Sequence, residues 1–401
     1  MRRANRISLS AVVVTLMTIA SGGAQTLTWI APFRGGCCSY AYGVSADGSV
    51  VVGVAYSPEG MRAFRWANGV MQDLGTLGGR ESRAYGVSFD GSVVVGDALT
   101  PTQNYIAFRW ENGVMQNLGT LGGNQSVARA VSPDGRVIAG SAVNSDGAWR
   151  AFLWENGMMY NLGAPYGGWS KAYALSSTGQ VIVGEIYVVG RWIAARWAWP
   201  WPPEQLGTLG GRWSEAFGVS ANGQIVVGRA TLPDGWGRAF RWTVNSQQMQ
   251  DLGTVGGRFS EAFGISADGR VIVGRSEDAR SRSSAFRWTA EGGMEDLNIT
   301  YARLLTNGSR LSGARAASPD GRYIVGHGYN IATAREEAYL LDTGFPPRGD
   351  VDRNGCVDDA DLLRVLFEFG AQGYRNEDLN WDGVVDDADL LIVLFNFGSG
   401  C

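Results

Sequence analysis

The chain has 401 residues, of which 45% are hydrophobic and 18% are charged, with 58 glycines and a formal net charge of −4. This length and composition provide enough apolar material for a buried core and for more than one domain. A mildly acidic chain lacks the basic footprint that nucleic-acid binding requires, so no nucleic-acid partner is expected. Its single histidine, His327, argues against most zinc chemistry and against a repeated acid–base scheme.

The N-terminus predicts a secretory signal peptide over residues 1–24. Arg2, Arg3 and Arg6 precede an apolar run from residue 9 to residue 20, and small residues follow up to Ala24. This order matches the charged region, apolar region and cleavage site of such a peptide. The apolar run is too short to favour a membrane span, and no later segment approaches about 18 uninterrupted apolar residues. We therefore expect a secreted or surface-attached mature chain without a membrane span, whose formal charge is −7 once three arginines are removed.

Residues 25–342 contain seven units of one repeat. Each unit has a β-hairpin signal, seen in Ala84–Gly96, in which a turn pair lies between two strand-like runs. Asp-Gly in such a pair favours a type I′ turn, which needs positive φ angles. The turns begin at Asp47, Asp90, Asp134, Thr178, Asn222, Asp268 and Asp320, at spacings of 43 to 52 residues. Periods of this size are typical of propellers and other repeat architectures.

Each unit has four strand-like segments, of which the third reads Ala-Phe-Arg-Trp in most units. Four short strands fit one β-propeller blade. Because successive side chains of a strand point to opposite faces, the Phe and the Trp of the third strand lie on one face, where we expect them to form the core between blades. The seventh unit stops after its third strand at Asp342, whereas Thr26–Ile30 is an orphan strand at the start of the mature chain. We predict a mainly β, seven-bladed β-propeller in which this strand completes blade seven and removes the free sheet edges. An open β-solenoid is the alternative.

The motifs Gly-Thr-Leu-Gly-Gly and Ala-Phe-Arg-Trp resemble those of the HAF family of extracellular repeat proteins. The resemblance covers about Thr26 to Asp342 and implies an exported repeat protein with no general activity. The chain departs from the family at the histidine before Ala-Phe, so no histidine-dependent role carries over. The residues at that position are Arg62, Ile106, Arg150, Arg238 and Ser284.

Tight turns and variable loops are expected on opposite faces of the ring. On the variable-loop face, a serine recurs in every unit and is interpreted as a local loop hydrogen bonder. The serines are Ser39, Ser82, Ser126, Ser170, Ser214, Ser260 and Ser312. The residue before this serine varies, and aromatic rings near charged groups suit sugar stacking or a protein partner. The ligand-binding candidates are Trp149, Trp169, Trp192, Trp213, Trp236 and Phe259. The alternative is that these rings only cap the blade ends.

No catalytic site is predicted. The Ser-x-Asp-Gly turns superficially resemble the aspartate boxes of sialidases, but the glycine stands one position early and the aromatic residue is missing. No paired carboxylates stand out from the turn aspartates. We interpret His327 as a solvated strand end.

A proline-containing linker at residues 343–349 separates the repeats from residues 350–401. That segment contains two acidic loops with oxygen side chains at positions 1, 3, 5, 9 and 12 and glycine at 6, the spacing that calcium requires. Position 7 would contribute a backbone carbonyl. The predicted ligands of two calcium ions are Asp350, Asp352, Asn354, Cys356, Asp358 and Asp361, and then Asp378, Asn380, Asp382, Val384, Asp386 and Asp389. Acidic turns without metal are the alternative.

Each acidic loop continues into a short apolar helix, predicted over Asp361–Phe369 and Asp389–Phe397 and ended by glycine. Paired loops with aspartate at position 12 and a helix only after each loop resemble a type I dockerin. The resemblance implies a cohesin-like partner on a scaffold or cell surface. The implied recognition residues are Asp359, Ala360, Leu363, Arg364, Asp387, Ala388, Leu391 and Ile392. Asp-Ala departs from the usual Ser-Thr pair, which leaves the type of partner open, and a thrombospondin type 3 repeat is the alternative.

Four cysteines follow the predicted cleavage site. We predict a disulfide between Cys356 and Cys401, which would join the ends of the C-terminal module and contribute roughly 4 kcal/mol in the chain-entropy model. For Cys37 and Cys38, a strained vicinal disulfide and two free thiols both stay open.

Two functions agree with these expectations. The first is a secreted noncatalytic binding or surface protein, whose propeller contacts a glycan or a protein and whose module docks to a cohesin-like partner in a calcium-dependent way. The second is a polysaccharide-active enzyme, a glycoside hydrolase or lyase, delivered by the module. A convergent pair of carboxylates on the variable-loop face would distinguish the enzyme from the binding protein.

Overall fold

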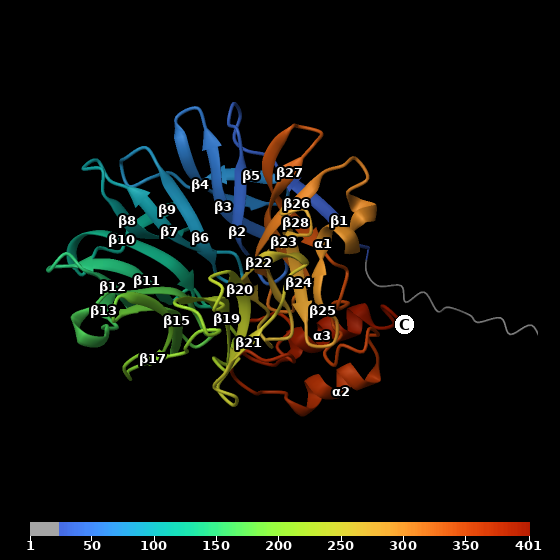
Figure 1. Ribbon diagram of the computed structural model, residues 1–401. Helices are drawn as coiled ribbons and strands as arrows, with labels where there is room; N and C mark the ends of the chain where they lie inside the picture. The colour runs from blue at the N-terminus through green and yellow to red at the C-terminus, as the bar shows by residue number, and fades with distance from the viewer. Residues whose placement is uncertain (1–23) are drawn as a thin grey trace, which may run out of the picture.

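The computed structural model describes residues 24–401, so the predicted signal peptide lies outside the described residues except for Ala24. Within this range the strands form seven four-stranded sheets arranged around a common centre (Figure 1). No helix in the same range is long and apolar enough to cross a membrane. The prediction of a mainly β, seven-bladed propeller is confirmed.

The first six blades follow one another along the chain. Blade one has β2 (Ser39–Val44), β3 (Val50–Ser57), β4 (Gly60–Ala67) and β5 (Val70–Asp73). Blade two has β6 (Ser82–Val87), β7 (Val93–Leu99), β8 (Tyr105–Glu111) and β9 (Val114–Asn117). Blade three has β10 (Gly122–Val131), β11 (Val137–Asn144), β12 (Trp149–Glu155) and β13 (Met158–Asn161), followed by the short η1 (Pro165–Gly167). Blade four has β14 (Ser170–Leu175), β15 (Val181–Val188), β16 (Arg191–Ala198) and β17 (Glu204–Gln205). Blade five has β18 (Ser214–Val219), β19 (Ile225–Thr231), β20 (Gly237–Thr243) and β21 (Met249–Asp251), and blade six has β22 (Gly256–Ile265), β23 (Ile272–Asp278), β24 (Ser283–Thr289) and β25 (Gly293–Asp296).

Blade seven joins the two ends of the propeller. It consists of β26 (Arg310–Ala317), β27 (Tyr323–Asn330) and β28 (Arg335–Asp342), with β1 (Thr26–Ile30) paired antiparallel to β28 as the fourth strand. Ile30, which lies opposite Ala338, is only 1% exposed. The orphan strand therefore completes the last blade as predicted, and the open solenoid is excluded.

The core lies between neighbouring blades and uses the Ala-Phe-Arg-Trp strands. In blade two, Phe108 and Trp110 on β8 pack against Val52 and Leu74 of blade one. Arg109 points to the opposite face, where its Nε donates to the carbonyl oxygen of Gly135 in the next blade at 3.2 Å. The predicted assignment of these aromatic rings to the core between blades is confirmed.

The two kinds of tight turn differ in backbone conformation. Asn68 and Gly69 both have positive φ angles, +50° and +81°, as a type I′ turn requires. In the Asp-Gly turns only the glycine has a positive φ, for example +73° at Gly48, so the predicted type I′ turn is wrong there. The reason is that Asp47 Oδ1 accepts hydrogen bonds from the Ser49 amide and the Ser45 hydroxyl, which fixes a wider turn.

A small helical insertion explains the longest repeat, the 52 residues between Asp268 and Asp320. It contains α1 (Leu297–Thr300) and η2 (Ala302–Leu304). Leu297 and Tyr301 are buried against Leu311 and Tyr339 of blade seven. The insertion therefore lengthens the unit without interrupting the ring.

The C-terminal module has two helices, α2 (Asp359–Phe367) and α3 (Asp387–Asn396), which lie on one side of the ring (Figure 1). Both helices start two residues earlier than predicted because Asp358 and Asp386 are their N-caps, each within a capping box. The module has its own core of five buried valines, Val351, Val357, Val365, Val385 and Val393.

The cysteines adopt one of the predicted pairings. Cys356 and Cys401 form a disulfide with Cα atoms 4.6 Å apart, which confirms that prediction. Cys37 and Cys38 are free thiols, so the vicinal disulfide is not formed.

Candidate functional sites

The first acidic loop, residues 350–361, folds around its own carboxylates. Asp350 Oδ2 accepts the Gly355 amide at 2.9 Å, and Asp361 Oδ1 accepts the Asp352 amide at 3.1 Å. Gly355 has φ +94°, the left-handed conformation that the bend at position 6 requires. One carboxylate oxygen from each of Asp350, Asp352 and Asp361 lies within 4.8 Å of the other two.

The second acidic loop, residues 378–389, repeats this arrangement. Asp378 Oδ2 accepts the Gly383 amide at 2.9 Å, and Asp389 Oδ1 accepts the Asn380 amide at 3.0 Å. Gly383 also has φ +94°. The two loops are therefore equivalent in hydrogen bonding as well as in sequence.

These residues fit a hard divalent cation. Burial, aided by Asp361, raises the pKa of Asp350 to about 6, and burial, aided by Asp389, raises the pKa of Asp378 to about 7. Clustered carboxylates at this spacing are the donor set that calcium prefers. The predicted ligands Asn354, Asp358, Asp382 and Asp386 lie in the same two loops. Cys356 is disulfide-bonded and offers only its carbonyl, and Val384 likewise has only a carbonyl to offer.

The helices of the module expose a twofold repeated apolar surface, which we call the helix surface. Its members come in pairs 28 residues apart: Leu363 and Leu391, Leu366 and Leu394, Phe367 and Phe395, and Phe369 and Phe397. Phe367 and Phe395 are each 83% exposed. Of the predicted recognition residues, Asp359, Ala360, Leu363, Arg364, Asp387, Ala388 and Leu391 are exposed and Ile392 is half-buried. The two phenylalanines were not predicted from the sequence, although their recurrence at the 28-residue period was a usable signal.

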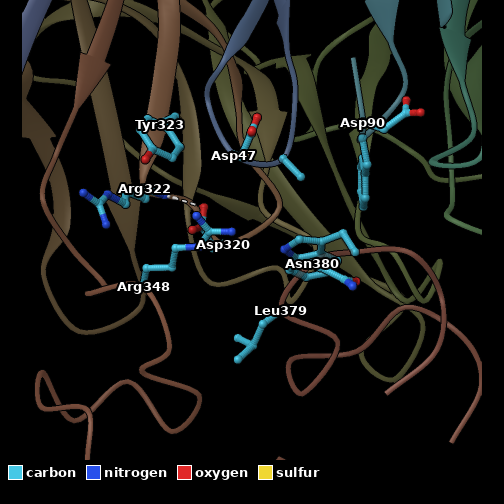
Figure 2. A pocket seen from close by; sticks show the side chains of 11 residues that line it. Asp47, Asp90, Asp320, Arg322, Tyr323, Arg348, Leu379 and Asn380 are labelled. Carbon is cyan, nitrogen blue, oxygen red and sulfur yellow. Dashed lines mark hydrogen bonds between the residues drawn. The ribbon is translucent and has the colours of Figure 1, made fainter. Parts of the chain in front are cut away.

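The acidic loops pack onto the tight-turn face of the propeller. Trp381, at position 4 of the second loop, lies with its ring centroid 5.5 Å from that of Phe89 in blade two. Arg353, at position 4 of the first loop, forms an ion pair of 3.1 Å with Asp268 in blade six. Figure 2 shows Asp47 and Asp90 at two propeller turns facing the loop that carries Asn380, around a cavity of about 160 Å³. The module therefore occupies the tight-turn face and leaves the variable-loop face free.

The variable-loop face has a pocket of about 710 Å³ between blades four and five. Trp192 and Trp213 line it, together with Arg212 and Arg229. The Arg229 guanidinium lies 4.5 Å from the centroid of the Trp213 ring. This combination of aromatic and cationic groups is suited to a sugar or a charged peptide.

The structure brings only some of the predicted aromatic candidates together. Trp169, 49% exposed, lies with its ring centroid 6.3 Å from that of Trp192. The centroid of the Phe259 ring lies 5.4 Å from the Arg275 guanidinium, and Phe259 does not line the pocket. Trp149 and Trp236 do not line the pocket, although Trp236 is 39% exposed.

Ion pairs join the first and second strands of four blades. The pairs are Arg83 with Asp97 at 2.9 Å, Lys171 with Glu185 at 2.8 Å, Arg229 with Glu215 at 2.5 Å, and Arg275 with Glu261 at 2.7 Å. Asp97, Glu185 and Glu261 are buried. Each of these carboxylates is held by a cation, which is a structural arrangement rather than the convergent pair that a glycosidase uses.

A ring of side chains lines the central channel. Every inner strand has a residue that is skipped in the pairing at the same point, as at Tyr42, where Ala41 pairs with Gly53 and Gly43 with Val52. Three of these strands have a second break in the pairing nearer their start. The residues skipped at this point are Tyr42, Tyr85, Arg129, Tyr173, Phe217, Phe263 and Arg315, and all of them except Tyr173 line the channel cavity. This ring was not predicted from the sequence, although aromatic residues and arginines recur there between two small residues.

His327 is not the solvated strand end that we predicted. It lies in the middle of β27, opposite Ala338, with its ring centroid 5.2 Å from that of Tyr40. Burial, together with Arg315 and Arg275, lowers the pKa of His327 to about 3, so the imidazole is neutral at physiological pH.

No protein-family model matches the chain, and no curated protein matches it. Among solved structures, the chain is similar to oligogalacturonate lyase from Vibrio parahaemolyticus, with 8% identity and a TM-score of 0.50 over 79% of this chain and 96% of that one. An oligogalacturonate lyase in complex with manganese is similar at 11% identity and a TM-score of 0.50, over 80% of this chain and 98% of that one. TolB from Acinetobacter baumannii has 12% identity and a TM-score of 0.44, and the match spans 64% of this chain and 61% of the TolB chain. At these identities the similarity supports only the propeller fold, and the resemblances to HAF repeats and type I dockerins stay predictions from the sequence.

Proposed function

We propose that this is a secreted binding protein whose C-terminal module docks it, in a calcium-dependent way, to a cohesin-like domain on a scaffold or cell surface. The observation that carries the proposal is the twofold repetition of an acidic loop followed by a helix with exposed leucine and phenylalanine side chains. Exposed large apolar side chains on two helices that contact each other are typical of a protein-binding surface. The propeller is the part that is held in place.

Calcium would be held by the carboxylates of Asp350, Asp352 and Asp361 in the first loop and by Asp378, Asp382 and Asp389 in the second. The ion would neutralise the clustered negative charge and fix each loop against its helix. The chain itself contributes the valine core, the capping boxes and the disulfide, which orient the two helices.

Calcium titration of the intact protein tests the metal part of the proposal. We expect two bound ions by isothermal titration calorimetry and a higher melting temperature of the module. The double variant Asp350→Asn and Asp378→Asn should lose this binding, whereas Asp146→Asn, in an exposed propeller loop, should retain it. Unchanged heat and melting on calcium addition would refute the assignment.

Binding to a panel of cohesin domains tests the docking part. Phe367→Ala combined with Phe395→Ala should weaken capture at least tenfold while calcium binding is retained. Failure of every cohesin to bind the calcium-loaded protein would contradict a cohesin-like partner.

We further propose that the variable-loop face contacts a glycan or a protein. Its support is the pocket that contains Trp192 and Trp213. Trp192→Ala and Trp213→Ala should each reduce retention on the glycan or protein identified by array screening, and Trp201→Ala, an exposed tryptophan on the opposite face, is the control. Retention that is equal in all three variants would exclude this pocket.

A polysaccharide-active enzyme is the alternative function. Two of the similar solved structures are oligogalacturonate lyases, but their likeness is one of fold. Incubation of the purified protein with pectic and other acidic polysaccharides, followed by chromatography of released oligosaccharides, distinguishes the two functions. Product release that depends on the protein would favour the enzyme.

A further inference from the structure

Blade seven lacks an ion pair that four of the other blades form between their first two strands, and blades one and three lack it as well, with Tyr40 opposite Val54 and Val127 opposite Ser141. In blades two, four, five and six, a residue on the first strand forms an ion pair with its cross-strand neighbour on the second. In blade seven the corresponding neighbours are Gly313 and His327. No carboxylate occupies either of these two positions in blade seven.

Three nitrogen atoms near this position are buried without a hydrogen-bond partner among the described residues. They are Arg275 Nε, Arg315 Nε and His327 Nδ1. Both guanidinium groups lie close enough to His327 to contribute to its lowered pKa. Buried polar groups are normally paired, and an unpaired cluster of this kind points to a missing partner.

The charged groups around this cluster do not balance. Arg229 pairs with Glu215 and Glu261, and Arg275 pairs with Glu261, whereas Arg315 forms no ion pair with any residue of the range 24–401. Three guanidinium groups therefore share two carboxylates. The wall of the channel between blades six and seven carries one uncompensated positive charge.

Space and aromatic surface lie next to this charge. The channel cavity, of about 240 Å³, is lined by Tyr42, Phe263 and Arg315, among other residues. The Arg315 guanidinium lies 4.0 Å from the centroid of the Phe263 ring and 5.9 Å from that of Tyr42. A Cβ atom at Gly313 would lie 3.2 Å from His327 Cε1, so the glycine keeps the space beside the imidazole open.

We propose that the channel wall between blades six and seven binds a small organic carboxylate through the guanidinium of Arg315, with Tyr42 and Phe263 framing its ring. Arg275 and His327 lie near Arg315 but do not line the cavity. A planar guanidinium matches a carboxylate with two parallel hydrogen bonds. The cavity volume limits the ligand to about the size of one sugar ring or one aromatic ring, which is below the usual range for larger ligands. This site is separate from the helix surface, so carboxylate binding can be tested independently of docking.

Calorimetric titration of the full mature chain with matched acids and neutral analogues tests the proposal. D-glucuronate is compared with D-glucose, and benzoate is compared with benzyl alcohol. We expect at least one acid to bind at least tenfold more tightly than its neutral analogue. Absence of binding by both acids, equal binding of acid and analogue, or tighter binding of inorganic phosphate than of either acid would overturn the carboxylate assignment.

Two variants locate the site. Arg315→Gln should weaken binding at least tenfold. Gly313→Glu should do the same, because it supplies the carboxylate that blade six has at this position and so competes with the ligand. Arg303→Gln removes an exposed arginine outside the channel and should leave binding unchanged.

Folding of each variant is checked by near-UV circular dichroism and by its melting temperature before binding is compared. If Arg315→Gln does not fold, Gly313→Glu decides the result. Undiminished binding in a folded variant of either kind would refute the location.

Discussion

The serine at the start of each inner strand joins neighbouring blades through two hydrogen bonds. Ser82 Oγ donates to the Gly75 carbonyl oxygen at 2.6 Å and accepts the Ala63 amide at 3.0 Å, and both partners belong to blade one. The same pair of bonds is made by Ser39, Ser126, Ser170, Ser214 and Ser260. The residue that we interpreted as a local loop hydrogen bonder therefore connects blades, which the sequence could not show because the partners are 7 to 299 residues away.

Replacement of Ser82 by alanine should lower the free energy of unfolding by about 1–3 kcal/mol, because the buried Ala63 amide would lose its partner. Urea unfolding followed by tryptophan fluorescence measures the change. Ser312→Ala is the matched control, since Asn298 Oδ1 accepts the neighbouring Leu311 amide at 2.8 Å at that junction. Equal losses in both variants would contradict a specific role for the buried serine.

His327 should make the propeller sensitive to acid. Its pKa in the folded protein, about 3, lies below the ordinary histidine value of 6.5. As the pH falls, the unfolded chain therefore binds a proton at this residue before the folded protein does. Stability from this residue is complete above about pH 6.5 and is lost progressively as the pH falls toward 3.

The variant His327→Gln removes that titration. Between pH 7 and pH 5, wild type should lose about 2 kcal/mol more unfolding free energy than the variant. Urea unfolding at both pH values provides the measurement, and parallel losses in the two proteins would show that the imidazole is protonated in the native state.

The strand β1 closes the ring because it is the fourth strand of blade seven. The hydroxyl of Ser39 donates to the Ile30 carbonyl oxygen in β1 at 2.5 Å and accepts the Ala338 amide in β28 at 2.9 Å. One residue of blade one thus connects the first and last strands of the propeller.

Deletion of residues 24–30 should expose the edge of β28 and cause oligomerisation, because an unpaired strand edge accepts another strand. Size-exclusion chromatography with light scattering measures the oligomeric state. A synthetic peptide of residues 26–33 added in trans should restore the monomer, whereas a scrambled peptide should not. A truncated protein that stays monomeric without the peptide would argue against closure by β1.

Elements with a strong local signal were predictable from the sequence. The seven hairpins, the orphan strand and the two acidic loops each have a repeated pattern at a fixed spacing. The skipped residues of the inner strands were not predictable, because a bulge such as that at Tyr42 depends on the pairing of two strands and on the curvature of the ring. For the same reason, the cluster of Arg275, Arg315 and His327 became visible only once blades six and seven were placed side by side.

At the scale of the whole molecule, the junction between propeller and module was also not predicted from the sequence. Position 4 of each acidic loop, Arg353 or Trp381, is neither a calcium ligand nor a helix residue, so no local pattern assigns it a partner. In the structure both residues have positive φ angles, +61° and +60°, and both contact the propeller. Each acidic loop therefore has two roles. Its carboxylate oxygens face the inside of the loop, and its side chain at position 4 contacts the blades.

This arrangement predicts that the module can be released from the propeller without loss of docking. Trp381 is 8% exposed and packs on Phe89, and burial of an aromatic side chain of this size contributes several kcal/mol to a contact. Trp381→Ala should increase the radius of gyration in small-angle X-ray scattering and speed proteolysis within residues 343–349, with calcium and cohesin binding retained. Phe395→Ala, at an 83% exposed position on the helix surface, should give the opposite result, a compact protein with weakened docking. If Trp381→Ala leaves scattering and proteolysis unchanged, the contact with Phe89 does not hold the propeller and the module together. The variant Arg353→Gln would then test whether the ion pair between Arg353 and Asp268 holds them together.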